Sequence, residues 1–180
     1  MNTPALSSSS PVVVIGAGPA GLMAAECLAM AGLKVEVFEK MPSVARKFLM
    51  AGRGGLNLTH SEPRPGFDNR YTEASDTIGA WLDGFDAADL VAWSEGLGQE
   101  TFVGTSGRIF PKAMKASPLL RAWLARLETI GVVIHTRHNW VGHDGDVWLF
   151  DTVAGRKSVR ADAVVLALGG GSYAKLGSDG

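Results

Sequence analysis

Three glycines near the amino end of the chain stand between two apolar runs, and this arrangement limits the fold more than any other feature. The first run and the glycines read Pro11-Val-Val-Val-Ile-Gly-Ala-Gly-Pro-Ala-Gly21, and the second run reads Val35-Glu-Val-Phe-Glu-Lys40. β-Branched residues without polar interruption are typical of a parallel strand that is buried on both faces. The spacing G-x-G-x-x-G between two such strands predicts a dinucleotide-binding βαβ unit with its helix in the middle.

Each glycine of this motif has its own physical reason. Gly16 allows the tight turn out of the strand, Gly18 lets the backbone approach a pyrophosphate, and Gly21 lets the helix pack closely on the sheet. The first helical turn then offers unpaired N–H groups and the positive end of its dipole to the anion. Proline is tolerated there because its missing N–H has no partner in the first turn. The residues predicted to contact the pyrophosphate are therefore Gly16, Gly18, Pro19, Ala20 and Gly21.

An acid closes the second apolar run. Glu39 stands where its carboxylate would accept hydrogen bonds from an adenosine ribose, and Lys40 follows it beside the same ligand. A carboxylate at this place repels a 2′-phosphate, so the first nucleotide is expected to be FAD or NAD rather than NADP. The alternative interpretation is an α/β domain with a glycine-rich turn and no ligand.

Composition narrows the class of protein. The 180 residues are 46% hydrophobic, which is enough to bury the core of one main domain. The net charge of −1 gives no electrostatic reason to expect nucleic acid. The one cysteine, Cys27, stands among apolar helical residues and is interpreted as a core thiol. The histidines show no spacing typical of a metal site.

The ends and the hydropathy of the chain suggest a cytoplasmic location. Residues 1–10 have neither a basic segment nor a long apolar run, so we interpret them as a disordered tail and not as a signal peptide. No run reaches the length of a membrane span. Residues 11–180 are then expected to form one nucleotide-binding domain.

The periodicity of the remaining sequence predicts an alternation of helices and strands. A helix from about Pro19 to Ala31 is apolar nearly all round and is expected to be mostly buried, with Gly32 as its cap. The other expectations are a short helix at 46–50, helices capped by Ser75 and Asp86, a helix opened by Ser117 and Pro118, a strand at 132–135, a meander near 140–143, 147–151 and 158–161, and an apolar strand at 163–168. We expect Trp81, Trp93, Trp123 and Trp148 on core faces.

The order of these elements separates two classes of dinucleotide-binding protein. A loop-and-helix excursion follows the second strand, and a β-meander then leads into a strand that ends in Gly169-Gly170-Gly171. This order resembles the flavoproteins of the glutathione-reductase type more than an NAD dehydrogenase. Three segments narrow the likeness: residues 46–59, residues 107–116 and residues 166–180. Together they resemble the BaiN/RdsA-like NAD(P)/FAD-dependent oxidoreductases of bacteria.

The resemblance implies a Rossmann-like α/β fold with a central parallel sheet and a three-stranded meander, FAD as cofactor and NAD(P)H as electron donor. It implies that the loop at 52–57 lies along the pyrophosphate and flavin, and that the meander offers the backbone of Trp140 or Val141 to the adenine. The further positions it assigns to the cofactor are Arg46, Lys47, Arg53, Gly54, Asn57, Val141, Gly169 and Gly170.

The sequence also departs from the family pattern. The loop at 52–57 lacks the cysteine of the usual G-G-R-C-N, which excludes thiol chemistry there. Leu168 replaces the threonine of the usual A-T-G-G, and Ala174 replaces a proline. Family members are about twice as long, so we expect the chain to be the N-terminal part of a longer protein.

Several residues keep two interpretations. Arg53 is favoured as a diphosphate ligand, whereas Arg46 and Lys47 are equally well explained as a solvated basic face. Asn57 and Thr59 are either flavin contacts or turn formers. His60 is the histidine nearest the flavin loop, although a lone loop histidine is more often a local hydrogen-bonding residue. The sequence therefore identifies no catalytic acid or base.

The expected function is that of an FAD-binding oxidoreductase, in which NAD(P)H reduces the flavin and an organic acceptor takes the hydride. The expected partner is a small-molecule substrate, with no nucleic acid and no membrane. Two alternatives stay open: a non-catalytic dinucleotide-binding module, and an FAD-dependent RNA-modifying protein.

Overall fold

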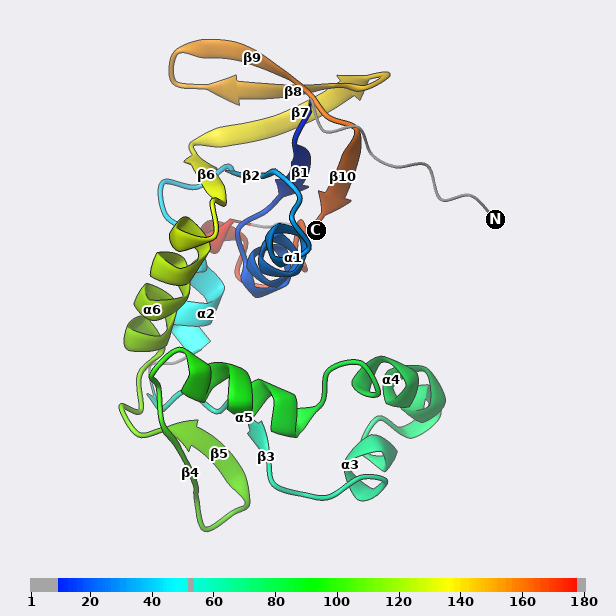
Figure 1. The fold of residues 1–180 in the computed structure, drawn as a ribbon, viewed down its shortest axis with the longest axis vertical. Coiled ribbons are helices and arrows are strands. Elements are labelled where there is room, and N and C mark those ends of the chain that lie inside the picture. The colour runs from blue at the N-terminus through cyan, green and yellow to red at the C-terminus, as the bar shows by residue number, and fades with distance from the viewer. Residues whose placement is uncertain (1–9, 52–53, 178–180) are drawn as a thin grey trace. The chain divides into compact units, whose positions relative to one another are not determined.

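The computed structural model describes residues 10–51 and 54–177, and the chain forms two compact units (Figure 1). The first unit comprises residues 1–48 and 124–180, and the second comprises residues 49–123. The expectations for the tail at 1–9 and for Arg53 lie outside the described residues.

A four-stranded parallel sheet forms the centre of the first unit. Its strands follow the order β10-β1-β2-β6, so the last strand of the described residues lies beside their first strand. Val12 in β1 pairs with Val35 in β2 and with Ala163 in β10. The sheet confirms the predicted βαβ unit and the Rossmann-like architecture. The strands are β1 (Val12–Ile15), β2 (Val35–Glu39), β6 (Val133–Thr136) and β10 (Ala163–Leu166).

Strand β10 ends earlier than predicted, at Leu166 instead of Leu168. The N–H of Ala167 still donates to the carbonyl of Ile15 at 2.8 Å, but the chain then turns at Gly169, whose φ is +77°. The glycine segment after β10 therefore starts at the same edge of the sheet as the glycine loop after β1, because parallel strands end together.

Helix α1 (Pro19–Met30) packs on the sheet through one face only, which contradicts the prediction that it is mostly buried. Its buried residues are Gly21, Leu22, Ala25 and Glu26, whereas Cys27 is exposed and is not a core thiol. A helix against one sheet buries a stripe, and its apolar outer face here has no cover from the described residues. Gly32 follows the helix with a φ of +84°, as predicted for its cap.

An antiparallel meander covers the sheet on the face away from α1 (Figure 1). Its strands are β7 (His138–Asp144), β8 (Val147–Thr152) and β9 (Gly155–Arg160), so the third begins three residues earlier than predicted. Tight turns join them after Asp144 and after Thr152. Buried residues of the sheet and the meander form one core: Val13, Ile15, Phe38, Phe150 and Ala161.

The second unit contains a small antiparallel sheet that the sequence did not reveal. Its order is β3-β5-β4, and β3 contributes only two residues, too few to show a hydrophobic period.

The predicted short helix at 46–50 is present as α2, and the helix with Ser117 and Pro118 is present as α6. The remaining elements are α2 (Arg46–Ala51), β3 (Thr59–His60), α3 (Gly66–Asn69), the 3₁₀ turn η2 (Thr72–Ala74), α4 (Ser75–Leu82), α5 (Ala87–Gly96), β4 (Thr101–Val103), β5 (Arg108–Pro111), α6 (Ala116–Thr129) and the 3₁₀ turn η3 (Ala174–Leu176).

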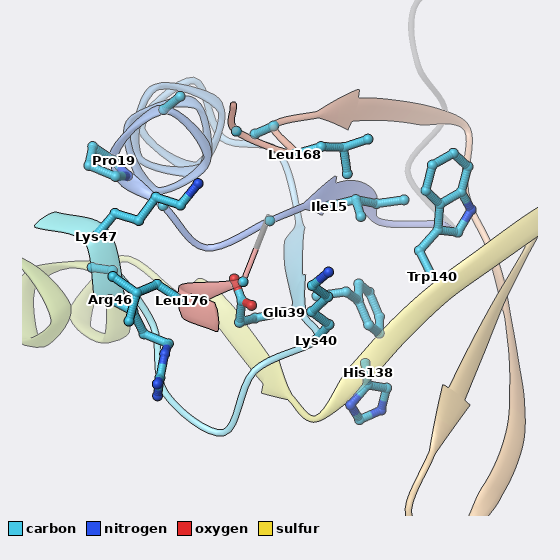
Figure 2. Close-up of a pocket in the computed structure, with 18 of the residues that line it drawn as sticks. Ile15, Pro19, Glu39, Lys40, Arg46, Lys47, His138, Trp140, Leu168 and Leu176 are labelled. Carbon is cyan, nitrogen blue, oxygen red and sulfur yellow. The ribbon is translucent and has the colours of Figure 1, made fainter. Parts of the chain in front are cut away.

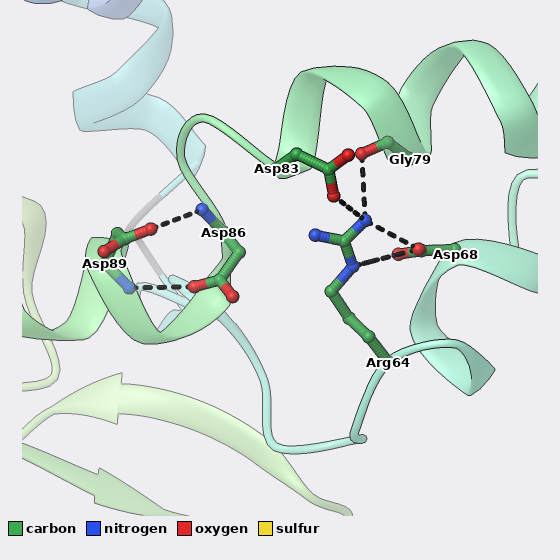
Figure 3. A network of polar contacts seen from close by, with 6 residues as sticks. All are labelled: Arg64, Asp68, Gly79, Asp83, Asp86 and Asp89. Carbon is green, nitrogen blue, oxygen red and sulfur yellow. Dashed lines mark hydrogen bonds and ion pairs between the residues drawn. The ribbon is translucent and has the colours of Figure 1, made fainter.

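Arg64 joins α3 to α4 through a network of polar contacts (Figure 3). Its guanidinium donates to the carboxylate of Asp68 at 2.8–3.0 Å and to the carbonyl of Gly79 at 2.9 Å. It also pairs with Asp83 at 2.9 Å. These acceptors raise the pKa of Arg64, with the hydrogen bonds to Asp68 contributing most. The network holds together two short helices, each of which would have little stability in isolation.

The two predicted helix caps had different outcomes. Asp86 caps α5 as predicted, and its side chain and that of Asp89 exchange hydrogen bonds with each other's backbone N–H (Figure 3). Hydrogen bonds from backbone N–H groups lower the pKa of Asp86. The Ser75 cap is wrong: Ala74 precedes α4 without a side-chain bond, and Ser75 donates backwards to the carbonyl of Thr72 at 2.6 Å.

The predictions for the tryptophans also had different outcomes. Trp123 is 2% exposed and packs edge-on against Trp93, whose ring centroid lies 4.8 Å away. Trp148 packs against the core of the first unit. Trp81 is 69% exposed, so its predicted place on a core face is wrong. Helix α4 is short, and no described residue of its unit covers that side of it.

A buried ion pair generates the first testable prediction. Glu26 of α1 is 2% exposed, and its carboxylate accepts from Arg126 Nε of α6 at 3.0 Å. Replacement Arg126→Ala removes the cation and leaves the carboxylate buried, so we expect a loss of about 1.5–3 kcal/mol in the free energy of unfolding. Urea denaturation measures this loss. Arg121→Ala, an exposed arginine of the same helix, is the control, and an equal effect of both variants would contradict the prediction.

Candidate functional site

A pocket of ≈ 340 Å³ lies in the first unit, where β1, β2 and β10 end and α1 begins (Figure 2). This edge of an open parallel sheet is the usual place for a ligand in α/β folds. The residues that line it are Ile15, Gly16, Gly18, Pro19, Ala20, Phe38, Glu39, Lys40, Ser43, Ala45, Arg46, Lys47, His138, Asn139, Trp140, Ala167, Leu168, Gly169, Leu176 and Gly177.

The three glycines of the first loop have three different surroundings. Gly16 has a φ of +105°, and a Cβ there would lie 2.3 Å from the carbonyl oxygen of Ala167. A Cβ on Gly21 would lie 1.9 Å from the carbonyl oxygen of Gly16. A Cβ on Gly18, in contrast, would meet no atom within 4 Å. Gly16 and Gly21 are thus required by packing, whereas Gly18 leaves open the space that a ligand backbone contact needs.

The amino end of α1 faces this pocket. Gly18 is the N-cap in an extended conformation and provides no side-chain cap, and Pro19 occupies the first helical position. The N–H groups of the first turn have no intrahelical acceptor, and they carry the positive end of the helix dipole. The pocket therefore combines a bare helix terminus with a glycine that has no side chain above it.

The carboxylate of Glu39 points back at the glycine loop (Figure 2). Its Oε2 accepts from the N–H of Ala17 at 2.9 Å, and its Oε1 accepts from the N–H of Met41 at 2.9 Å. Each oxygen keeps a further lone pair, because a carboxylate offers about four acceptor sites. Glu39 thus holds the loop in shape and still has acceptor capacity toward the pocket that it lines.

Basic side chains border the pocket beside α1. Lys47 Nζ donates to the carbonyl of Gly170 at 2.6 Å and so links α2 to the glycine segment after β10. Arg46 Nη1 donates to Ser43 Oγ at 3.2 Å, whereas Arg46 Nε is buried and has no hydrogen-bond partner. A buried donor without an acceptor is costly, which marks this position as one that an acceptor would stabilise.

Strand β7 forms the opposite end of the pocket with Phe38. His138 and Trp140 stand two residues apart on this strand and both line the pocket (Figure 2). Val141 does not line it: the register between β7 and β8 shifts between Trp140 and Gly142, so Val141 lies in a bulge. Of the two alternatives for a backbone contact, Trp140 is therefore the one at the pocket.

The other predicted positions are not among the residues that line this pocket. Gly54 and Asn57 belong to the second unit, and Gly170 contacts the pocket residue Lys47 without lining the pocket itself. Thr59 pairs with Ile109 in the small sheet. Whether any of these positions contacts a cofactor stays a prediction.

His60 also lies in the second unit, on β3, and both of its ring nitrogens are engaged. Nδ1 accepts from the N–H of Glu62 at 3.0 Å, and Nε2 lies 2.9 Å from the carbonyl oxygen of Ser106. A ring held in this way fits a local hydrogen-bonding residue better than a proton shuttle.

The sequence did not predict several lining residues. Phe38 lines the pocket because β2 ends there, and His138 and Asn139 do so because β6 leads directly into β7. Leu176 and Gly177 line it because the chain returns there after β10. The period-2 alternation of His138 and Trp140 is the one local signal that could have indicated the shared face.

Two further features concern the described ranges, 10–51 and 54–177, as a whole. No three His, Cys, Asp or Glu side chains gather there as metal ligands would. No helix in those ranges has the length and hydropathy to cross a bilayer.

The different surroundings of the glycines generate a paired prediction. Gly21→Ala forces a Cβ against the carbonyl of Gly16, so we expect it to lower the free energy of unfolding by about 1–3 kcal/mol or more. Gly18→Ala meets open space at a negative φ and is expected to cost less than about 1 kcal/mol. Denaturant titration compares the two, and a larger loss for Gly18→Ala would contradict the assignment.

Comparison with known proteins shows what the chain is similar to. A 60-residue part of the chain is 43% identical to a ribosomal RNA dihydrouridine synthase of Haemophilus influenzae, over 33% of this chain and 15% of that protein. The 3-ketosteroid-Δ4-(5α)-dehydrogenase of Rhodococcus jostii RHA1 has a similar fold, with a TM-score of 0.63 and 17% identity over 93% of this chain and 48% of that one. A flavocytochrome c3 fumarate reductase gives a TM-score of 0.57 and 19% identity over 91% and 34%.

The two structures show likeness of fold, and the chain spans less than half of the length of either of them. The model of one family, described as the HI0933-like protein Rossmann domain, matches residues 10–180, nearly the whole chain, and confirms the resemblance on which the sequence analysis relied. The chain belongs to the HI0933-like Rossmann-domain family.

Proposed function

We propose that the protein is an FAD-binding oxidoreductase in which NAD(P)H reduces the flavin and an organic acceptor takes the hydride. The observation that carries the proposal is the meeting of Gly18 and Glu39 in one pocket at the amino end of α1. A dinucleotide needs an anion site and a ribose acceptor at this separation along a βαβ unit.

The residues of the pocket fit the diphosphate of such a cofactor. Its oxygens would accept from the first-turn N–H groups of α1, above Gly18, where no side chain intervenes. Arg46 Nε is a buried donor that lacks an acceptor, and a diphosphate oxygen would supply one. Lys47 adds positive charge at the same wall of the pocket.

The adenosine end would lie toward β2 and β7. Glu39 would accept from the ribose hydroxyls through the lone pairs that its two backbone contacts leave open. Its negative charge disfavours a 2′-phosphate, which supports FAD over NADP as the resident group. Trp140, rather than Val141, is the meander residue at this end.

Bound FAD would supply two-electron chemistry: a hydride from NAD(P)H and a proton from solvent together saturate an activated C=C bond of the acceptor, releasing NAD(P)⁺. The described residues hold and orient the cofactor. None of them is assigned here as the proton donor. The alternative is a dinucleotide-binding module without catalysis. Oxidation of NAD(P)H under anaerobic conditions with candidate acceptors would exclude this alternative, and its absence would support it.

Cofactor retention gives the direct test. Gly18→Leu fills the space above the helix end, so we expect the purified variant to lose its flavin absorbance while remaining soluble and folded. Gly96→Leu is the matched control, because Gly96 lies at a helix end with open space and does not line the pocket. A wild-type protein without the two-band flavin spectrum, or a Gly18→Leu variant that retains it fully, would contradict the proposal.

A second candidate function concerns the acceptor, and the dihydrouridine synthase relative favours it. Reduction of uridine to dihydrouridine saturates the C5=C6 bond of a uracil base, which is an activated C=C bond of the kind proposed. The acceptor would then be a uracil in RNA instead of a small molecule. The overall charge of −1 argues against a broad basic RNA surface, so recognition would have to be local.

Product analysis separates the two acceptors. Incubation of the purified full-length protein with NAD(P)H and unmodified ribosomal RNA is expected to form dihydrouridine if RNA is the acceptor. Nucleoside mass spectrometry of the digested RNA measures it, with the Gly18→Leu variant as the control. Turnover of NAD(P)H with small acceptors but no dihydrouridine would support the small-molecule acceptor instead.

A further inference from the structure

A second cavity, of ≈ 360 Å³, lies within the second unit and shares no lining residue with the pocket of the first unit. It is formed by β3 and the residues after it, by α3 and the residue that follows it, and by β5 and the turn before it. Its lining is polar and aromatic: His60, Glu62, Phe67, Arg70, Ser106 and Arg108.

Protein contacts fix most of these side chains in place. Arg70 donates to both carboxylate oxygens of Glu62, through Nε at 3.0 Å and Nη2 at 3.1 Å. This paired hydrogen bond lowers the pKa of Glu62 and raises the pKa of Arg70, so both stay charged. His60 is engaged at both ring nitrogens. The rim of the cavity is therefore preorganised by groups that already have partners.

Arg108 is the exception. It stands on β5 opposite His60 and is exposed. Within residues 10–51 and 54–177, no group accepts a hydrogen bond from its guanidinium, whereas the guanidinium of Arg70 donates to Glu62. The charged side chains of the lining carry one more positive than negative group, because the two arginines face a single carboxylate. The cavity thus holds a fork of donors that has no acceptor of its own.

We propose that this cavity binds the phosphate group of a nucleotide, with Arg108 donating to the phosphate oxygens and Phe67 providing an aromatic face for the base. A guanidinium suits a phosphate because its planar fork binds two oxygens at once. An aromatic ring beside it matches the way in which single-stranded nucleotides are held. The assignment rests on the second candidate function, in which a uracil of RNA is the acceptor.

Equilibrium binding tests this site without requiring flavin or turnover. Isothermal titration calorimetry of the purified full-length protein with uridine 5′-monophosphate is expected to show binding that weakens as salt is added. Arg108→Gln is expected to weaken it about tenfold or more, because a charge-assisted fork is lost. Arg108→Lys keeps the positive charge without the planar fork of donors, so its affinity is expected to lie between those of the wild type and Arg108→Gln. Arg121→Gln, at another exposed arginine of the same unit, is the matched control and is expected to bind as the wild type does.

Further ligands identify the chemistry. Uridine and inorganic phosphate are expected to bind more weakly than the monophosphate, since each lacks one half of the contact. Tighter binding of an oligouridylate would identify RNA as the source of the phosphate, and equal binding would identify a free nucleotide. Absent binding of the monophosphate, unchanged binding in Arg108→Gln, or equally tight binding of succinate would overturn the assignment. A protein that lacks flavin but shows the Arg108-dependent binding would disprove the oxidoreductase and leave this site standing.

Discussion

The close contact between the glycine loop, the start of α1 and the end of β10 is the constraint on which the pocket depends. A Cβ on Gly21 would lie 1.9 Å from the carbonyl oxygen of Gly16, and a Cβ on Gly16 would lie 2.3 Å from the carbonyl oxygen of Ala167. Backbone therefore packs on backbone at this point, which brings the helix terminus within reach of the strand ends. The hydrogen bond from Ala17 to Glu39 then connects the loop to β2. One small region thus sets the positions of the amino end of α1 and of the Glu39 carboxylate together.

Much of this region is predictable from the sequence because its rules are local. The places of Gly16, Gly18 and Gly21 at the turn and the start of α1 follow from their spacing, and the place of Glu39 at the end of β2 follows from the end of an apolar run. The parallel sheet and the meander follow from apolar runs and turn residues. The Asp86 cap also follows from a short motif with a carboxylate three residues later.

What the sequence could not predict depends on what covers each surface. Cys27 and Trp81 have apolar neighbours in the sequence, yet neither is covered in the structure, because periodicity does not reveal which faces meet a partner. Strand β3 has two residues and carries no pattern at all. Ser75 has the chemistry of a cap, but its hydroxyl bonds backwards to Thr72, and only the local turn decides that choice.

The strand order β10-β1-β2-β6 has a consequence for how the protein is made. Lys47 bonds to Gly170 across 123 positions of the chain, and Leu176 and Gly177 complete the wall that Gly18 begins. A ribosome releases the glycine loop long before it releases this wall. The emerging βαβ unit would therefore keep the amino end of α1 uncovered until residues 163–177 have left the ribosome and β10 has paired with β1, a slow step because the two strands are far apart in the sequence.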